Sequence, residues 1–235
     1  MEMILAARFM ARSPSHYGAL LFGIFILVFA IIAHRKNPQS KAARASLFLI
    51  IAANLLSIFH TSGSHYFFGK SNDLNHIIPL HLCDLTALVA AAALITRKPL
   101  FCEVTYYLGL GGTLQGLITP NVILDFPHPT YFSFFQLHLF VVITALLLPL
   151  GLGWRPRLPL WKTMLRTFLI ICGYLLIIYG VNSAIGTNYA FLMEKPVNPS
   201  LYDHLGPHPW YILSVLGLVI VMLGILTLPF LRKKS

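Results

Sequence analysis

The chain has 235 residues, of which 57% are hydrophobic and only 10% are charged, and its mean hydropathy is +0.76. Soluble globular domains carry about 25% charged residues, so this composition excludes an ordinary soluble domain and indicates an integral membrane protein. The formal net charge of +10 would suggest a nucleic-acid partner in a soluble protein, but the positions of the basic residues give a different explanation.

Seven apolar stretches follow one another along the chain. Roughly 20 apolar residues cross a hydrocarbon core as a helix. The stretches are 17–33, 45–60, 77–95, 100–118, 131–152, 163–185 and 209–231. The first runs directly into a basic cluster at 34–36 without a small-residue cleavage site, so we expect a retained helix rather than a signal peptide. The sequence therefore predicts an all-α polytopic bundle of seven transmembrane helices, forming a single transmembrane domain over residues 1–235.

Basic residues are concentrated in alternate connections between these stretches. Of the 17 lysines and arginines, 13 lie in segments 34–44, 96–99, 153–166 and 232–234. Because an excess of Lys and Arg marks cytoplasmic loops, we expect the N-terminus outside and the C-terminus inside. Topology thus accounts for the positive charge, and we expect no nucleic-acid partner.

Three polar groups that are costly to bury stand within PLHLCDLTAL, residues 79–88, at the start of the third stretch. Ionisable residues inside a span mark functional sites. His81 and Asp84 are three residues apart and share a helical face, so Asp84 can fix the tautomer and orientation of the His81 ring. Cys83 points almost the opposite way and needs a base from another helix. His138, ~10 Å into the fifth stretch at the helical rise, is the expected base.

Further polar side chains at the same level are candidates for substrate binding. They are Gln115, Asn121, Gln136, Asn188, Tyr189 and Trp210. Histidines in the outer loops have an equally good alternative explanation as members of an interfacial belt. These are His65, His76, His128, His204 and His208. A cysteine in a membrane helix is commonly a small hydrophobe, as we expect for Cys102 and Cys172.

The glycine-rich stretch GLGGTLQG, residues 109–116, has neither the preceding strand nor the lysine of a phosphate-binding loop. Small residues at this density let membrane helices approach closely. We therefore expect a packing role for this stretch, with Gln115 as the exception.

Several ordered motifs resemble one family of membrane proteins. They are IPLHLC at 78–83, TPN at 119–121, FFQLH at 134–138, NYAFLMEKP at 188–196 and PWY at 209–211. Over roughly residues 45–215 the chain resembles the bacterial YwaF-like integral membrane proteins, which are related to the eukaryotic transmembrane protein 164. The resemblance implies a bacterial plasma-membrane protein and an acyltransferase that acts on phospholipids. In the eukaryotic relative, a cysteine carries the acyl group with the help of a histidine, and Cys83 and His138 match these two positions.

The leading hypothesis is thus a membrane-embedded acyltransferase that moves a fatty acyl chain between phospholipid and lysophospholipid through a thioester on Cys83. His138 would act as the base, amide side chains would stabilise the oxyanion, and no metal or other cofactor is expected. One rival is a metal-dependent lipid hydrolase with His81, Asp84, His138 and a loop histidine as ligands. The other is a small-molecule transporter or binding protein, which the lack of an inverted repeat and of an inner polar cluster disfavours. The sequence leaves the oligomeric state open.

Overall fold

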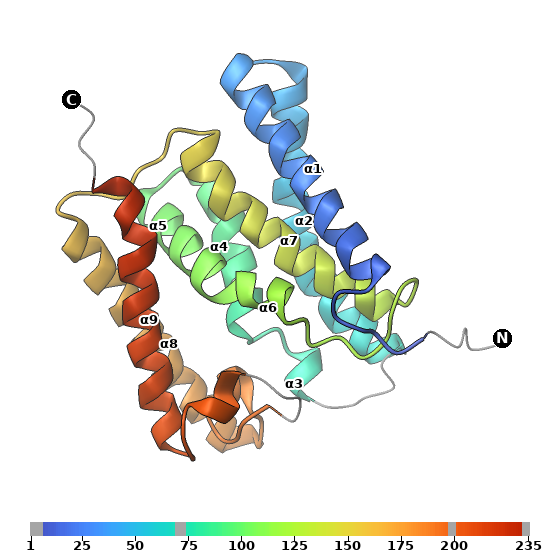
Figure 1. The fold of residues 1–235 in the computed structure, drawn as a ribbon, viewed down its shortest axis with the longest axis vertical. Coiled ribbons are helices and arrows are strands. Elements are labelled where there is room, and N and C mark those ends of the chain that lie inside the picture. The colour runs from blue at the N-terminus through green and yellow to red at the C-terminus, as the bar shows by residue number, and fades with distance from the viewer. Residues whose placement is uncertain (1–6, 69–73, 197–200, 232–235) are drawn as a thin grey trace.

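The computed structural model describes residues 7–68, 74–196 and 201–231, without the side chain of His76. The basic tail 232–234 therefore falls outside the described residues. Within the described ranges the chain is helical (Figure 1), apart from connecting segments and an isolated β-bridge between Arg8 and Leu124. The elements are α1 (Pro14–Lys36), α2 (Lys41–Phe68), α3 (Leu74–Ile77), α4 (Leu82–Thr96), α5 (Pro99–Leu108), the π-helix η1 (Gly109–Thr113), α6 (Leu114–Ile118), α7 (Pro129–Leu150), α8 (Leu160–Ile185), the short 3-10 helices η2 (Tyr189–Phe191) and η3 (Leu201–His204), α9 (Trp210–Thr227), and the 3-10 helix η4 (Leu228–Phe230).

Five helices in the described ranges are long and apolar enough to cross a membrane. They are α1, α2, α7, α8 and α9 extended by η4. The chain is therefore a multi-pass helical membrane protein, as the composition predicted. The expected spans 77–95 and 100–118 take another form, because α4 has 15 residues and the segment from α5 to α6 contains a change of helix type. At the helical rise, α4 is about 22 Å long, which is shorter than a hydrocarbon core of about 30 Å.

The start of α4 is fixed by local capping. Pro79 precedes the helix, and the backbone N–H of His81 donates to the Asp84 carboxylate at 3.1 Å. A carboxylate at the third helical position that binds the N-cap N–H is half of a capping box, so the helix begins at Leu82. At the other end Arg97 adopts a left-handed φ of +55° and its N–H donates to the Ala93 carbonyl oxygen.

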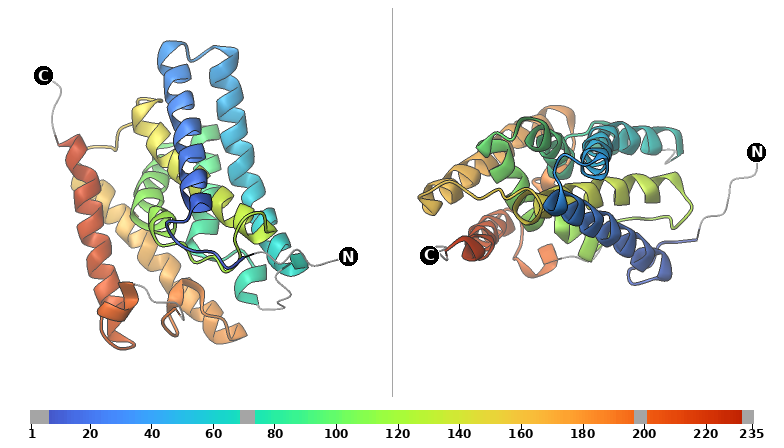
Figure 2. Two further views of the ribbon diagram at one scale, coloured as in Figure 1. Left: turned by 45° about the vertical axis from the view of Figure 1, so that its right-hand side comes forward. Right: turned by 90° about the horizontal axis from the view of Figure 1, so that it is seen from above.

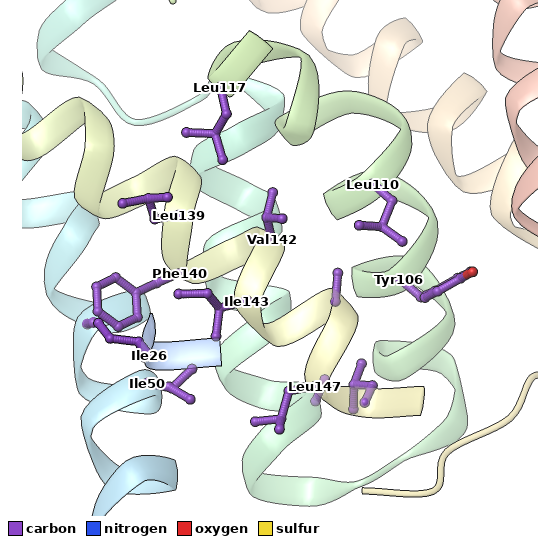
Figure 3. Close-up of a cluster of buried hydrophobic side chains, with 14 of the residues drawn as sticks. Ile26, Ile50, Tyr106, Leu110, Leu117, Leu139, Phe140, Val142, Ile143 and Leu147 are labelled. Carbon is purple, nitrogen blue, oxygen red and sulfur yellow. The ribbon is translucent and has the colours of Figure 1, made fainter. Parts of the chain in front are cut away.

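Helix α7 is the centre of the bundle, with α1 and α2 on one side and α8 and α9 on the other (Figure 1 and Figure 2). In its membrane-length window 72% of the residues are buried, against 17% in α8 and in α9. Figure 3 shows the core that α7 forms with its neighbours through Leu139, Ile143 and Leu147. Large apolar side chains on α1, α8 and α9 are exposed instead, for example Phe25, Leu176 and Val221. Such exposed apolar surface fits contact with lipid tails.

The ends of the helices group at two opposite ends of the bundle. At one end, which we call the Cys83 end, the His16 ring Nε2 bonds the Leu117 carbonyl oxygen at 2.9 Å, and Tyr131 donates to the Ser15 carbonyl oxygen at 2.7 Å. This end holds the starts of α1, α4 and α7. At the other end, which we call the basic end, Arg35 donates to the carbonyl oxygen of Leu150 at 2.7 Å.

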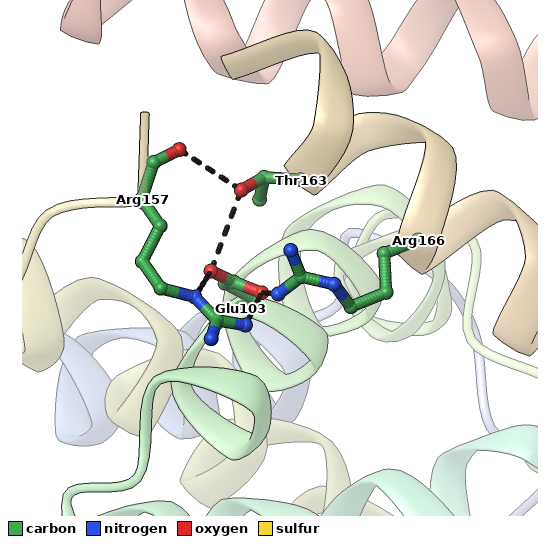
Figure 4. A network of polar contacts seen from close by, with 4 residues as sticks. All are labelled: Glu103, Arg157, Thr163 and Arg166. Atoms are coloured by element: carbon green, nitrogen blue, oxygen red, sulfur yellow. Dashed lines mark hydrogen bonds and ion pairs between the residues drawn. The ribbon is translucent and has the colours of Figure 1, made fainter. Parts of the chain in front are cut away.

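A buried polar network lies near the basic end, where the sequence analysis had found no inner polar cluster, so that interpretation was wrong. The Glu103 side chain is fully buried and accepts hydrogen bonds from Arg157 at 2.8 and 3.1 Å and from Arg166 at 2.8 Å. Thr163 lies between Glu103 and the Arg157 carbonyl oxygen (Figure 4). The network ties the start of α8 and the segment before it to α5.

Candidate functional site

A cavity of about 440 Å³ opens at the Cys83 end between α2, the starts of α4 and α7, and the segment that follows α8. All four predicted catalytic residues line it, together with two of the predicted substrate-binding residues. These are His81, Cys83, Asp84, His138, Asn121 and Asn188. The structure thus brings together residues that are up to 107 positions apart in the sequence.

His138 is held in one orientation on α7. Its Nδ1 lies 2.8 Å from the Phe134 carbonyl oxygen, and its ring stacks on the Phe134 ring with centroids 4.0 Å apart. A carbonyl oxygen only accepts, so Nδ1 carries the proton and Nε2 of the neutral ring has a free lone pair. Among the described residues Nε2 has no hydrogen-bond partner. This is the tautomer that a general base requires.

Gly116 of α6 provides the space for that ring. A Cβ at this position would lie 2.4 Å from His138 Cδ2 and 2.6 Å from Nε2. The helix backbone therefore borders the His138 imidazole so closely that only glycine fits. The close approach expected of the glycine-rich stretch is present, and here it serves the candidate base.

Cys83 is the second residue of α4. Its half-buried side chain packs on Ala87 of the same helix and on Leu137 and Val141 of α7. The first N–H groups of a helix have no acceptor within it, and among the described residues no carbonyl accepts from the N–H groups of Leu82 or Cys83.

Asp84 and His81 interact differently from the prediction. Asp84 binds the backbone N–H of His81, whereas the His81 ring places Nε2 3.0 Å from the Asn75 carbonyl oxygen. That carbonyl oxygen fixes the proton on Nε2 of His81. The His81 ring also meets the edge of Tyr189, with centroids 5.0 Å apart. Asp84 therefore shapes the site through the start of α4, and the contacts of the ring come from α3 and the segment after α8.

The side chain of Asn188 stabilises its own loop. Its Oδ1 accepts from the N–H groups of Met193 and Glu194 at 2.9 and 3.3 Å, and its Nδ2 donates to the Glu194 carbonyl oxygen at 2.9 Å. Asn188 thus shapes the wall of the cavity. Asn121 lines the cavity with an exposed side chain.

Four predicted substrate-binding residues are not among the described residues that line the cavity. The Gln136 amide bridges α7 to α2, through the Ala53 carbonyl oxygen at 3.1 Å and His60 Nδ1 at 2.8 Å. Gln115 is exposed on α6, and Trp210 is 65% exposed at the start of α9. These positions give no support to a direct contact with a substrate in this cavity.

Tyr189, the fourth, is fully buried and fixes the cavity wall. Its hydroxyl donates to the carbonyl oxygens of Leu74 at 2.5 Å and Ile78 at 3.1 Å, and its backbone N–H donates to Asn182 Oδ1 at 2.9 Å. The segment after α8 is thereby fastened to α3 and to the approach to α4. The next two residues, Ala190 and Phe191, have φ values of +55° and +53°, and consecutive left-handed non-glycine residues are a strained arrangement found mainly at functional sites.

Sequence reasoning missed several residues that line the cavity. They are Thr61, His65, Asn75, Ser133, Phe134, Phe191 and Glu194. The sequence analysis placed His65 in an outer loop, with equal odds of belonging to an interfacial belt; that placement was wrong, because His65 lies in the last turn of α2. Phe134 and His138 stand four residues apart, a spacing that stacks side chains on one helical face, so FFQLH contained a signal for this ring pair.

The alternative metal site is not supported by the arrangement of its ligands. No group of three His, Cys, Asp or Glu side chains among the described residues is placed to hold a metal ion. One ring nitrogen each of His81 and His138 and one carboxylate oxygen of Asp84 bond backbone groups as described above.

Comparison with known proteins gives a family and no closer match. The chain matches no curated protein and no solved structure. The model of the TMEM164 family matches residues 11–227, a longer region than the motifs had suggested. The narrower grouping with bacterial YwaF-like proteins stays a prediction. Since the match covers nearly the whole chain and confirms the relation to transmembrane protein 164, the chain belongs to the TMEM164 family.

Proposed function

We propose that the protein is an acyltransferase that moves a fatty acyl chain between phospholipid and lysophospholipid through a thioester on Cys83. The observation that carries the proposal is the meeting of Cys83 on α4 and His138 on α7 in one cavity, with the His138 ring held as the Nδ1–H tautomer. A cysteine near an imidazole with a free Nε2 is the combination that covalent acyl transfer uses.

In the first half of the reaction, the Cys83 thiol gives its proton to His138 Nε2 as the sulfur attacks the ester carbonyl carbon of a phospholipid. The carbonyl oxygen becomes an oxyanion. When the ester C–O bond breaks, the departing lysophospholipid oxygen takes the proton from His138. The products are a lysophospholipid and an acyl group bound to Cys83 through sulfur.

In the second half, the hydroxyl of an acceptor lysophospholipid gives its proton to His138 Nε2 and attacks the thioester carbon. The C–S bond breaks, and the Cys83 sulfur takes the proton back. A new ester is formed and the protein is restored, so no cofactor is consumed. Water in place of the lysophospholipid would release a free fatty acid instead.

Stabilisation of the oxyanion is assigned to the start of α4. The unpaired N–H groups of Leu82 and Cys83 stand at the positive end of the helix dipole, beside the nucleophile itself. One such donor is worth about 2.7–4 kcal/mol in the transition state of acyl transfer. Of the amides that the sequence offered for this role, Gln115, Asn121 and Gln136, only Asn121 is among the described residues that line the cavity.

The substrate reaches the cavity from the membrane. A volume of about 440 Å³ lies within the range of small-molecule sites, about 300–1,000 Å³. It accommodates the ester linkage and the adjoining glycerol, while the acyl chains stay among lipids. The mixed lining, with Leu137 and Phe134 beside Asn121, suits the boundary between headgroups and tails.

The proposed topology places this cavity at the outer leaflet of a bacterial plasma membrane. We count α4 and the α5–η1–α6 segment as shortened crossings, which gives seven spans in one domain with the N-terminus outside and the C-terminus inside. The support is the charge distribution, since Lys36, Arg97, Lys98 and Arg157 lie at the basic end.

The test is to trap the acyl group. Full-length protein incubated with a diacyl phospholipid and no acceptor should gain the mass of one acyl chain on the peptide that contains Cys83. Neutral hydroxylamine should release it, because a thioester is cleaved where an oxygen ester persists. Cys83→Ala should lose both the adduct and the turnover, while Cys102→Ala and Cys172→Ala serve as matched controls and should keep them.

His138→Ala should fold and bind lipid but lose turnover, because a general base acts on the chemical step. A Cys83→Ala variant with full activity would end the thioester proposal. In that case, loss of activity on chelation would favour the metal-dependent hydrolase, and lipid-independent solute flux in proteoliposomes would favour a transporter.

A further inference from the structure

A second cavity, of about 380 Å³, lies at the basic end of the bundle, where α1, α4 and α7 finish. Helix α4 separates it from the Cys83 cavity by about 20 Å along the helix axis. Its lining is His34, Pro38, Arg97, Cys102, Leu148, Gly151, Leu152 and Trp154. None of the proposed acyl-transfer residues is among them.

Two buried ring nitrogens in this lining have no partner. His34 is 6% exposed, and its Nε2 has no hydrogen-bond partner among the described residues; the same holds for Nε1 of Trp154. The Trp154 ring itself is firmly placed, since it packs on Tyr106 and Phe230 with centroids 5.4 and 6.0 Å apart. A buried donor without an acceptor is costly, and the indole N–H can only donate. The Trp154 nitrogen therefore indicates a ligand that accepts hydrogen bonds, and His34 Nε2 can donate to the same ligand when it carries the ring proton.

The charge of the cavity lining indicates that this ligand is negatively charged. Arg97, a permanent cation, lines the cavity with an exposed side chain. None of the described residues in the lining is an aspartate or a glutamate. The nearby carboxylate of Glu103 is already paired with Arg157 and Arg166.

Several helix carbonyls at this end are already hydrogen-bonded, which weakens their repulsion of an anion. The last carbonyls of a helix carry partial negative charge. Here the Ala93 carbonyl accepts from the backbone N–H of Arg97, and the Leu148 carbonyl accepts from the backbone N–H of Trp154. The Leu150 carbonyl accepts from the Arg35 side chain. The nitrogen-bearing side chains of the described lining are those of Arg97, His34 and Trp154.

We propose that this cavity binds the phosphate group of an anionic phospholipid from the adjacent leaflet, with Arg97 as the cation and the His34 and Trp154 ring nitrogens as donors. Basic pockets between membrane helices at the cytoplasmic surface are suited to anionic headgroups. The exposed apolar side chains of α1 leave room for the acyl chains alongside. A free phosphate ion offers the same chemistry, so the experiment separates the two sources.

The experiment uses the full chain, freed of lipid in an uncharged detergent, and follows its thermal unfolding midpoint against ligand concentration. Dioctanoyl phosphatidic acid should raise the midpoint in a saturable manner, and dioctanoylglycerol, which has the same chains without the phosphate, should not. A rise of the same size with inorganic phosphate would support the phosphate site and assign it to a soluble anion.

Single substitutions then locate the site. Trp154→Phe removes one N–H and keeps an aromatic ring, so the apparent affinity for phosphatidic acid should fall about ten-fold, the loss of one hydrogen bond to a charged group. Arg97→Gln should weaken binding at least as much. The matched control is Lys98→Gln, which removes the same charge one position away and outside the lining, and it should change the affinity less than two-fold.

Three results would overturn the proposal: no saturable rise with phosphatidic acid, an equal rise with dioctanoylglycerol, or equal losses in Lys98→Gln and Arg97→Gln. If Trp154→Phe unfolds without ligand, the comparison of Arg97→Gln with Lys98→Gln decides, since both side chains are exposed. Binding is measured without turnover, so this outcome is independent of the acyl-transfer test.

Discussion

Replacing Gly116 with alanine tests the position of the candidate base with a single methyl group. The new Cβ would stand 2.4–2.6 Å from the His138 ring, well inside contact distance. The ring cannot retreat freely, because it stacks on Phe134 and its Nδ1 is bonded to the Phe134 carbonyl oxygen. Either the ring rotates and loses that bond, or α6 moves away from α7.

The expected losses of stability and turnover in Gly116→Ala follow from a comparison with Gly112→Ala in the same glycine-rich stretch. At Gly112 the nearest atom to a new Cβ is Leu82 Cδ2 at 3.7 Å, an ordinary contact. Both substitutions gain helix propensity, about 1 kcal/mol, so their difference isolates the clash. Overpacking of this kind costs about 1–3 kcal/mol, and a misplacement of the base by about 1 Å costs about 100-fold in rate.

The assay has two parts, unfolding in detergent and acyl transfer to a lysophospholipid. Gly112→Ala should match or slightly exceed the stability of the unmodified protein and keep its turnover. Gly116→Ala should be less stable than Gly112→Ala by about 1–3 kcal/mol and lose most of its turnover. Equal stability of the two variants would refute the close approach of Gly116 to His138. If the two variants differ in stability but have equal turnover, Gly116 does lie close to His138, and His138 does not act in the reaction.

Three further predictions concern the surrounding structure. Tyr189→Phe should lower stability by about 1 kcal/mol, because the hydroxyl that joins η2 to α3 is lost; an unchanged unfolding midpoint would contradict this. Glu103→Gln should lower the free energy of unfolding by about 1–3 kcal/mol, since the arginines left behind are partly exposed. Removing both Arg157 and Arg166 leaves a buried carboxylate and should lower it by about 3–5 kcal/mol. The reverse order, measured by thermal unfolding, would show that the network is not organised around a buried charge. In intact cells an impermeant thiol reagent should label His204→Cys and not Gln39→Cys, with the unmodified chain as background; the opposite pattern would reverse the proposed topology.

The sequence located the five long apolar helices, because the signals of such helices are local. Proline at the first position of α1, α5 and α7, and glycine after α8 with φ of +69°, mark boundaries that depend only on nearby residues. That Cys83 and His138 would line one cavity was likewise predictable, since costly polar groups in apolar helices must share a polar environment.

Contacts between distant residues could not be predicted in the same way. Gln136 was taken for a substrate ligand, but its amide joins α7 to Ala53 and His60 of α2. An amide in a span needs partners, and a neighbouring backbone satisfies it as well as a substrate does. The ion pairs of Glu103 could not be predicted either, because its partners lie 54 and 63 positions later in the chain.

Helix α4 begins later than the expected span, at Leu82, and this late start bears on the proposed chemistry. Had the helix begun near residue 77, the N–H of Cys83 would have bonded the carbonyl oxygen of Pro79, as in any helix interior. Pro79 and the bond from His81 N–H to Asp84 start the helix at Leu82 instead, so no carbonyl of the described residues accepts from the N–H groups of Leu82 and Cys83. Asp84 was expected to orient a catalytic ring, and its contact with the backbone has a different effect. It places Cys83, the proposed nucleophile, and the proposed oxyanion donors on the same first turn of α4.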